Sequence, residues 1–167
     1  MRVLISILMC STLLACIPMA EPPPLLSAAP STPGRDAFYA GLQAGDYSSL
    51  EDTIEILTRE MLEGDDISTA TLGFAHAWRL AEASRLEEGS ARVIESADMA
   101  VRYFTESSEA LPNDPRLKGF LGSFKQALGA IHDRPEYQRE GWFDQKKAVR
   151  AWPEWALFTQ AFGLITL

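Results

Sequence analysis

Apolar residues along most of the chain recur every three or four positions, which is the spacing of one face of an α-helix. In the clearest stretch, Leu117, Leu121, Phe124, Leu128 and Ile131 lie on one such face. Few segments have the strict alternation of apolar and polar residues that is typical of a half-buried strand. The pattern predicts seven helices, at about residues 36–44, 48–63, 67–86, 90–111, 115–131, 137–151 and 153–165.

Residues at the ends of these segments agree with helix starts and stops. Ser48 and Glu51 have the spacing of a capping box, and Asp114 followed by Pro115 is a typical N-cap with proline at the first helical position. Gly64 is placed to end the helix at 48–63. Helix 67–86 also has a stripe of small residues that would let a neighbouring helix approach closely: Ala70, Gly73, Ala77, Ala81 and Ser84.

Two pairs of similar segments recur at nearly one distance along the chain. Leu72-Gly73 and Leu121-Gly122 are 49 residues apart, and segments 100–104 and 148–152 are 48 residues apart. Repeated units of two helices cannot bury their apolar faces alone, so they stack on their neighbours. The sequence therefore predicts an all-α fold in which antiparallel helical hairpins stack as a short α-solenoid. A non-repetitive helical bundle is the alternative.

Around residues 100–122 the sequence resembles the tetratricopeptide repeat family. Ala100, Phe104, Ser107 and Pro112 have the spacings of the second helix in that family's pattern. The next repeat would then start at residue 115, and it has its leucine-glycine pair where the pattern requires one. The resemblance implies tetratricopeptide-like hairpins over residues 35–167. Packing between repeats would involve Gly73, Ala100, Phe104, Pro112, Leu121 and Gly122.

The sequence also departs from this family in two respects. The hairpin from Leu72 to Pro112 is about fifteen residues longer than the standard repeat. Lys118 and Lys125 stand where the family usually has a tryptophan and a tyrosine. Despite these departures, the family resemblance implies a concave groove that holds an extended peptide or a partner helix.

The first residues have the features of an export signal. Arg2 is followed by an almost wholly apolar run that is too short to span a bilayer as a permanent helix. Leu13-Leu14-Ala15-Cys16 resembles the lipobox of bacterial lipoproteins, in which the cysteine is diacylated and becomes the new N-terminus after cleavage. The resemblance implies a signal peptide at 1–15 and a lipid anchor on Cys16. An ordinary cleaved signal with an incidental cysteine is the alternative.

Residues 16–34 combine the cysteine with a proline-rich linker that includes the run Pro22-Pro23-Pro24. Such a segment prefers the extended polyproline conformation, at roughly 3 Å per residue, and would hold a domain up to about 50 Å from the membrane. In lipoproteins an aspartate after the cysteine often retains the protein at the inner membrane. Ile17 stands there, which favours the periplasmic face of the outer membrane.

The charges are unevenly distributed along the chain. The sequence has 15 basic and 23 acidic residues, a net charge of −8, which argues against a broad nucleic-acid surface. Residues 36–66 contain nine acids and one base, whereas residues 114–150 contain five acids and eight bases. A surface with two signs can orient a partner or stack molecules head to tail. The acidic run Glu60, Glu63, Asp65 and Asp66 lacks the spacing of a calcium loop and is interpreted as a solvated turn.

The sequence contains no motif that predicts catalysis, and we expect neither a cofactor nor a metal site. It has no glycine-rich phosphate loop and no metalloprotease or serine-hydrolase motif. The two histidines, His76 and His132, are 56 residues apart in the sequence. His76 is interpreted as a packed side chain, and Asp133 after His132 as the cap of the next helix.

An aromatic cluster near the C-terminus provides the candidate binding residues. It consists of Tyr137, Trp142, Phe143, Trp152, Trp155, Phe158 and Phe162. Tryptophan and arginine dominate binding hot spots, and bases lie beside the cluster. Trp152, Phe158 and Phe162 are expected in a hairpin core. The candidate partner contacts are Arg139, Trp142, Lys146, Lys147 and Arg150, with packing of Trp142 in the hairpin core as the alternative.

Together these features predict a membrane-anchored envelope lipoprotein that acts as a non-catalytic helical-repeat scaffold for an envelope protein or peptide. The alternative is a periplasmic, substrate-binding accessory of a transporter, with a small molecule as its ligand. An enzyme is the least favoured class. Cys10 would leave with the signal peptide and Cys16 would carry the lipid, so no free thiol would remain, and the two histidines are too far apart in the sequence to suggest a nucleophile-base pair.

Overall fold

The computed structural model describes residues 30–83, 89–154 and 156. Within these residues there are six α-helices, one short 3-10 helix and no strand, so the all-helical prediction is confirmed there. In chain order the elements are α2 (Pro33–Ala44), η2 (Tyr47–Ser49), α3 (Leu50–Leu62), α4 (Asp66–Glu82), α5 (Ser90–Ala110), α6 (Pro115–Ile131) and α7 (Pro135–Ala151).

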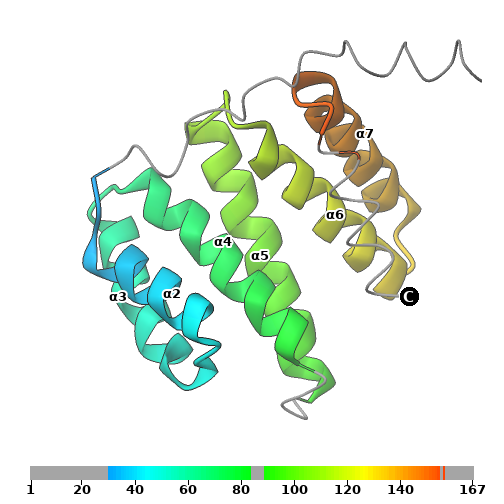
Figure 1. Cartoon of the computed structure of the whole chain (residues 1–167). Coiled ribbons are helices and arrows are strands. Elements are labelled where there is room, and N and C mark those ends of the chain that lie inside the picture. Colours follow the sequence, from blue (N-terminus) through cyan, green and yellow to red (C-terminus); the bar gives the residue numbers. More distant parts are fainter. Residues whose placement is uncertain (1–29, 84–88, 155, 157–167) are drawn as a thin grey trace, which may run out of the picture.

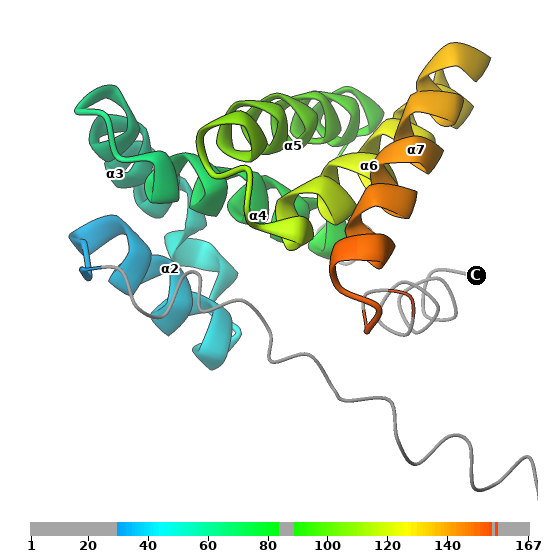
Figure 2. The ribbon, with the colours of Figure 1, turned by 90° about the horizontal axis from the view of Figure 1, so that it is seen from above.

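Each helix packs on the next one along the chain. The two most extensive contacts join α4 to α5 and α6 to α7, and α5 packs on α6 between these pairs. Helices α2 and α3 lie at one end of the molecule and α7 lies at the opposite end (Figure 1). The view from above gives the same order (Figure 2). The acidic helix α3 and the basic helix α7 are therefore far apart in space (Figure 1).

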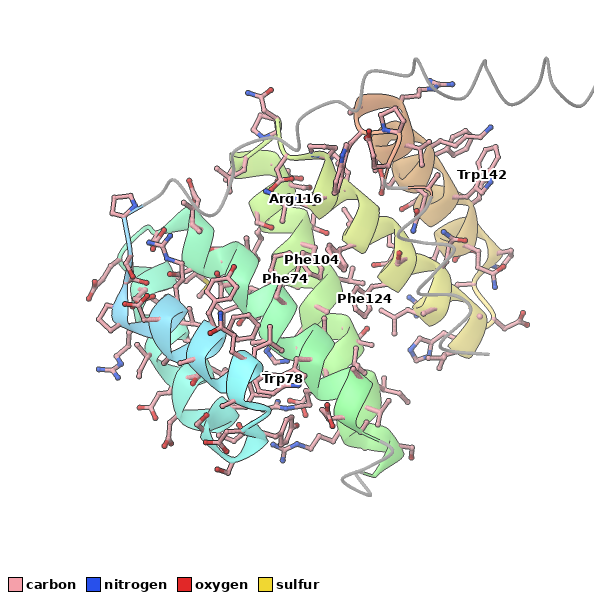
Figure 3. The ribbon with its side chains drawn as sticks, in the orientation of Figure 1. Phe74, Trp78, Phe104, Arg116, Phe124 and Trp142 are labelled. Atoms are coloured by element: carbon pink, nitrogen blue, oxygen red, sulfur yellow. The ribbon has the colours of Figure 1, made fainter. Side chains whose placement is uncertain are left out.

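The main core surrounds Phe104, whose side chain is fully buried. Its ring stacks on Phe120 at 5.5 Å and on Phe124 at 5.8 Å, and meets the edge of Phe74 at 5.1 Å between ring centroids. Figure 3 shows Phe74, Phe104 and Phe124 together between α4, α5 and α6. A Cβ added at Gly73 would lie 2.8 Å from the Phe104 ring. The absence of a side chain at Gly73 is therefore what allows α4 and α5 to approach so closely.

A second apolar cluster joins α2, α3 and α4 to the same core. Phe38, Leu50, Leu57 and Leu72 are buried in it, and Trp78 packs against them. The Trp78 ring meets the edges of Phe38 at 6.1 Å and Tyr47 at 5.7 Å. Glu51 of α3 also forms ion pairs with Arg79 of α4 and Arg92 of α5. Apolar and charged contacts thus hold α3 on the α4–α5 pair.

Helix α2 begins at Pro33, within the range predicted as linker and three residues before the predicted helix start. Thr32 caps it, because its hydroxyl accepts a hydrogen bond from the backbone N–H of Arg35. Proline at the first helical position lacks the N–H that would be unsatisfied there. The threonine-proline pair therefore starts this helix in the same way as Asp114-Pro115 starts α6.

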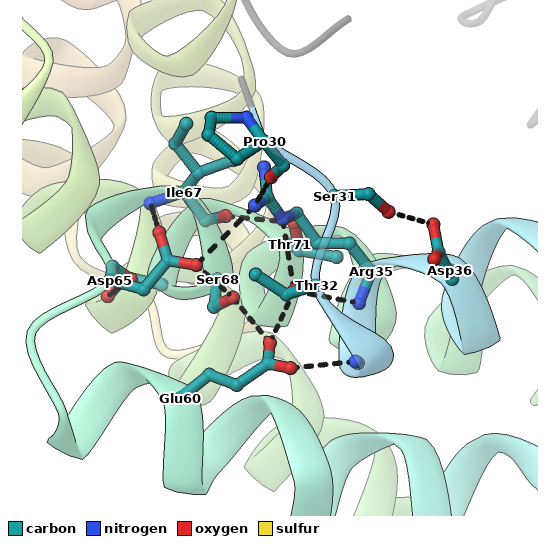
Figure 4. A network of polar contacts seen from close by, with 12 residues as sticks. Pro30, Ser31, Thr32, Arg35, Asp36, Glu60, Asp65, Ile67, Ser68 and Thr71 are labelled. Carbon is teal, nitrogen blue, oxygen red and sulfur yellow. Dashed lines mark hydrogen bonds and ion pairs between the residues drawn. The ribbon is translucent and has the colours of Figure 1, made fainter.

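Glu60 fixes the start of α2 to the α3–α4 hairpin (Figure 4). Its carboxylate accepts hydrogen bonds from the Thr32 hydroxyl at 2.8 Å, the Gly34 N–H at 2.8 Å and the Ser68 hydroxyl at 2.7 Å. Burial opposes ionisation of this carboxyl, but the three hydrogen bonds outweigh it and lower the pKa of Glu60. The interpretation of Glu60 as part of a solvated turn is therefore wrong.

Arg35 completes the same network from α2. Its buried guanidinium donates to the Thr32 hydroxyl at 3.2 Å and to the backbone carbonyl of Pro30. It also lies 3.7 Å from the Asp65 carboxylate, which caps α4 by accepting from the Ile67 N–H. The end of the proline-rich segment is therefore attached to the domain by specific polar contacts.

Several local predictions differ from the structure. Ser48 and Glu51 do not form a capping box, because the Asp46 side chain accepts from the Ser48 N–H and hydroxyl instead and starts η2. Asp133 does not cap α7: it has a φ of 52°, and α7 begins without a side-chain cap. Ile131 is 54% exposed, because α6 ends there.

Three other predictions concern parts of the chain at the edge of the described structure or beyond it. Trp152 is half-buried just after α7. Phe158 and Phe162, and most of the predicted helix at 153–165, lie outside the described residues. The predicted signal peptide at 1–15 and Cys16 lie outside them as well. No helix in the described part of the chain is both long and apolar enough to cross a membrane.

Candidate functional site

The candidate site is the outer face of α7, and glycines determine how α7 is placed. Gly122 of α6 and Gly141 of α7 face each other, and a Cβ added to either would lie 2.5 Å from the carbonyl oxygen of the other. One turn further along each helix, Gln126 and Gln145 lie over the opposite glycine. The two backbones can meet in this way only because neither glycine has a side chain.

Polar contacts on the inner face of α7 complete its attachment to α6. Lys125 donates to Asp144 at 3.0 Å and lies 3.5 Å from Glu140. Burial opposes the charge on this lysine, but the hydrogen bond to Asp144 and the two carboxylates raise the pKa of Lys125. Two of the three acids of α7 are therefore turned toward α6, and their charges are compensated there.

The outer face of α7 is aromatic and basic. Trp142 is 46% exposed and Phe143 is 50% exposed, and their rings meet edge to face at 5.0 Å. The amine of Lys146 lies 3.8 Å from the centre of the Trp142 ring, which is a close cation–π contact. Figure 3 shows Trp142 pointing away from the other helices. The bundle therefore leaves this tryptophan accessible.

An open pocket of about 280 Å³ lies beside Trp142. It is lined by Trp142, Gln145, Lys146, Val149 and Arg150. Its walls thus combine an indole ring and a valine with two cations. Such a pocket can take an apolar side chain whose neighbours carry negative charge.

The five predicted contact residues differ in what they face. Arg139, Trp142, Lys146, Lys147 and Arg150 are all exposed on α7. Lys147 lies 3.6 Å from Asp144, so its charge is partly compensated within the helix. Among the described residues, neither Lys146 nor Arg150 has an ion-pair partner. These two cations line the pocket and can meet an acidic partner there, whereas Arg139 lies two turns before Lys146 along the helix.

The predicted repeat-packing residues occupy two contacts in the structure. Gly73, Ala100, Phe104, Leu121 and Gly122 are buried, whereas Pro112 is exposed in the turn between α5 and α6. Gly73 and Phe104 touch across α4 and α5. Gly122 belongs to the α6–α7 contact instead. Its partner Gly141 was not predicted, although a glycine inside a helical segment indicates a close approach.

His76 is a buried residue of α4 whose ring stacks on Tyr103 at 5.6 Å. Burial and the nearby Arg79 guanidinium lower the pKa of His76 to about 4, with Glu51 opposing them. The ring is therefore neutral near pH 7. His132 is exposed at the end of α6. In the part of the chain that the structure describes, no group of three histidine, cysteine, aspartate or glutamate side chains could hold a metal ion.

Comparison with known proteins gives no relative. No family model, no curated protein and no solved structure matches the chain.

Proposed function

We propose that this protein is a non-catalytic scaffold, anchored in the bacterial envelope through a lipid on Cys16, that binds a protein partner on the outer face of α7. The observation that carries the proposal is the accessible Trp142 beside two uncompensated cations, Lys146 and Arg150. Tryptophan together with arginine is typical of binding hot spots, and Phe143 extends the exposed aromatic surface beside Trp142.

The arrangement of the helices is compatible with the tetratricopeptide-like solenoid in this proposal. Each helix packs on the next, and α7 is the last described helix of the series, so its outer face has no following helix in the described residues. In a stacked array the final unit presents one face that another molecule can cover.

The proposed lipid anchor would determine where in the envelope the outer face of α7 lies. The proline-rich segment ends at Pro30, whose carbonyl accepts from Arg35 of the folded domain. An extended segment of this kind would separate the domain from the outer-membrane surface while fixing where the tether joins it. The scaffold would then hold its partner on the periplasmic side.

The alternative is a substrate-binding accessory of a transporter. The pocket of about 280 Å³ beside Trp142 and Val149 is the observation that favours it. A small molecule there would depend on the apolar walls, whereas a protein partner would depend on the cations as well.

Crosslinking in native membranes tests the scaffold. A tagged wild-type chain should capture a stoichiometric protein that a Cys16→Ser variant does not capture. Lys146→Glu with Arg150→Glu should weaken the capture, and high salt should weaken it in wild type. Arg134→Glu, an exposed reversal at the other end of α7, is the matched control and should change little. Capture unchanged by the double reversal would contradict the scaffold and move the proposal to a small-molecule ligand.

A further inference from the structure

The most exposed large apolar side chain in the described residues is Leu62, at the end of α3. It is 77% exposed and lies in the acidic half of the protein. Glu63 follows Leu62 directly, and Glu55 lies two turns earlier on the same face of α3, with the exposed Arg59 between Glu55 and Leu62. Neither glutamate has an ion-pair partner among the described residues. Leu62 is therefore an apolar knob with one acid, Glu63, directly beside it and a second, Glu55, about 10 Å away along α3.

The pocket on α7 has the opposite character. Trp142 and Val149 provide apolar walls, and Lys146 and Arg150 provide uncompensated cations. An apolar knob between acids is complementary to an apolar pocket between bases, in charge as well as in polarity. Within one chain these two surfaces cannot meet, because α3 and α7 lie at opposite ends of the molecule (Figure 1, Figure 2).

We propose that the α7 pocket receives Leu62 of a second copy of this chain, so that copies associate head to tail. Lys146 and Arg150 of one copy then face Glu55 and Glu63 of the next. The inference rests on the proposed function of the α7 surface and names its partner. Because two different surfaces meet, the association is heterologous, and it builds an open array or a closed ring.

A single knob and two ion pairs make a weak contact in dilute solution. Copies anchored in one membrane face each other at a much higher effective concentration, which turns a weak contact into a populated one. The inferred association is therefore strongest in the anchored state, is measurable in solution at high protein concentration, and depends on salt.

Sedimentation velocity of the full chain, extracted in a mild detergent, tests the association. The wild-type chain should associate at rising concentration in low salt, and about 0.5 M NaCl should weaken this about tenfold. Lys146→Glu with Arg150→Glu, or Glu55→Lys with Glu63→Lys, should each weaken it at least about tenfold. Mixing the two double variants should restore association between them, because the reversed charges are again complementary.

The knob has its own matched pair of variants. Leu62→Ala should weaken association about tenfold, whereas Leu42→Ala, on the exposed side of α2, should leave it unchanged. Both leucines are exposed, so neither substitution should unfold the chain, and circular dichroism checks this. Equal effects at the two positions would overturn the contact.

Disulfide crosslinking tests directly whether Leu62 of one copy lies beside Val149 of another. In chains carrying Cys10→Ser and Cys16→Ser, a tagged Leu62→Cys chain mixed with an untagged Val149→Cys chain should form a mixed dimer on oxidation. Leu62→Cys with Ala130→Cys, an exposed position on α6, should not. Equal yields from both pairs would overturn the proposal.

Failure of this inference and failure of the proposed function give different results. A chain that stays monomeric in low salt overturns the head-to-tail contact. If the same chain still loses its membrane partner on Lys146→Glu with Arg150→Glu, the scaffold stands with a different partner. If the capture in membranes is also unaffected, both proposals fail.

Discussion

Gly122 and Gly141 stand opposite each other where α6 and α7 cross, and each would place a Cβ 2.5 Å from the carbonyl oxygen of the other. The contact is reciprocal, because Gln145 covers Gly122 in the same way as Gln126 covers Gly141. Few apolar side chains of α7 are buried, so this backbone contact and the Lys125–Asp144 pair position the helix that carries the candidate site.

Replacing Gly122 by leucine should therefore overpack the crossing and destabilise the protein by about 1–3 kcal/mol. The substitution gains helix propensity, but neighbouring backbone atoms would have to move to accommodate the side chain. Urea denaturation measures the free energy of unfolding. Ala127→Leu, at an exposed position on α6, is the control and should change it little. A Gly122→Leu protein that unfolds like wild type would show that the helices do not meet there.

Substitutions of the buried Phe104 and the half-exposed Phe143 form a matched pair that tests the packing of the core. Phe104 is fully buried among three aromatic rings, whereas Phe143 is half exposed on α7. Phe104→Ala should lower the free energy of unfolding by about 3–5 kcal/mol, because it removes buried apolar surface and leaves a cavity. Phe143→Ala should lower it by less than about 1 kcal/mol. Similar losses in urea denaturation would contradict the placement of these two rings.

His76 should make the protein less stable as the pH falls. Its pKa is about 4 in the folded protein and 6.5 as the ordinary value, so the unfolded chain binds more protons between these limits. The stabilisation is complete above pH 6.5 and decreases as the pH falls toward 4. At pH 5 the loss should be about 2 kcal/mol.

His76→Phe keeps a ring against Tyr103 but removes the titration. The variant should therefore lack this loss between pH 7 and pH 5, as followed by urea denaturation. His132→Gln, which changes the exposed histidine, should keep the wild-type pH dependence. An unchanged slope in His76→Phe would contradict the buried neutral histidine.

The Glu60 carboxylate should stabilise the start of α2 only while it is ionised. Glu60→Gln keeps the shape but weakens the hydrogen bonds from Thr32, Gly34 and Ser68, so it should lower the free energy of unfolding at pH 7 by about 1–3 kcal/mol. The folded pKa lies below the ordinary 4.5, so the wild-type advantage is present above pH 4.5 and is lost below it.

Hydrogen exchange of the Gly34 amide gives a local measurement of the same contact. Exchange at Gly34 should be faster in Glu60→Gln than in wild type, because this N–H donates to the carboxylate. Glu55→Gln, an exposed glutamate on the same helix, should leave both exchange and stability unchanged. A Gly34 amide that exchanges at the wild-type rate in Glu60→Gln would argue against the network.

The sequence predicted helices well where the signal is local. The apolar spacing at 90–111 and 115–131 and the pair Asp114-Pro115 place α5 and α6 within a residue of their bounds. The same kind of pair, Thr32-Pro33, starts α2, but the surrounding prolines indicate a linker in the sequence and conceal this signal. The predicted capping box of Ser48 and Glu51 does not form, because the Asp46 carboxylate accepts hydrogen bonds from the N–H and hydroxyl of Ser48 instead.

Contacts between distant residues were predicted less completely. Gly122 was expected at a close contact, but the sequence did not show that Gly141 would be its partner, since nothing local relates the two positions. Helical spacing left the environment of Trp142 open, because this residue lies at the flank of α7 between the buried and the outer face. Its exposure depends on which helix covers that flank, and only the tertiary structure answers this.

The most direct test of the scaffold is a photo-crosslinking amino acid at position 142, in the tagged chain in native membranes. We expect one stoichiometric protein adduct at position 142, weakened by Lys146→Glu with Arg150→Glu and by high salt. The same group at the exposed position 130 on α6 should give none. Equal adducts at both positions, or none at 142, would contradict a protein-binding surface on α7.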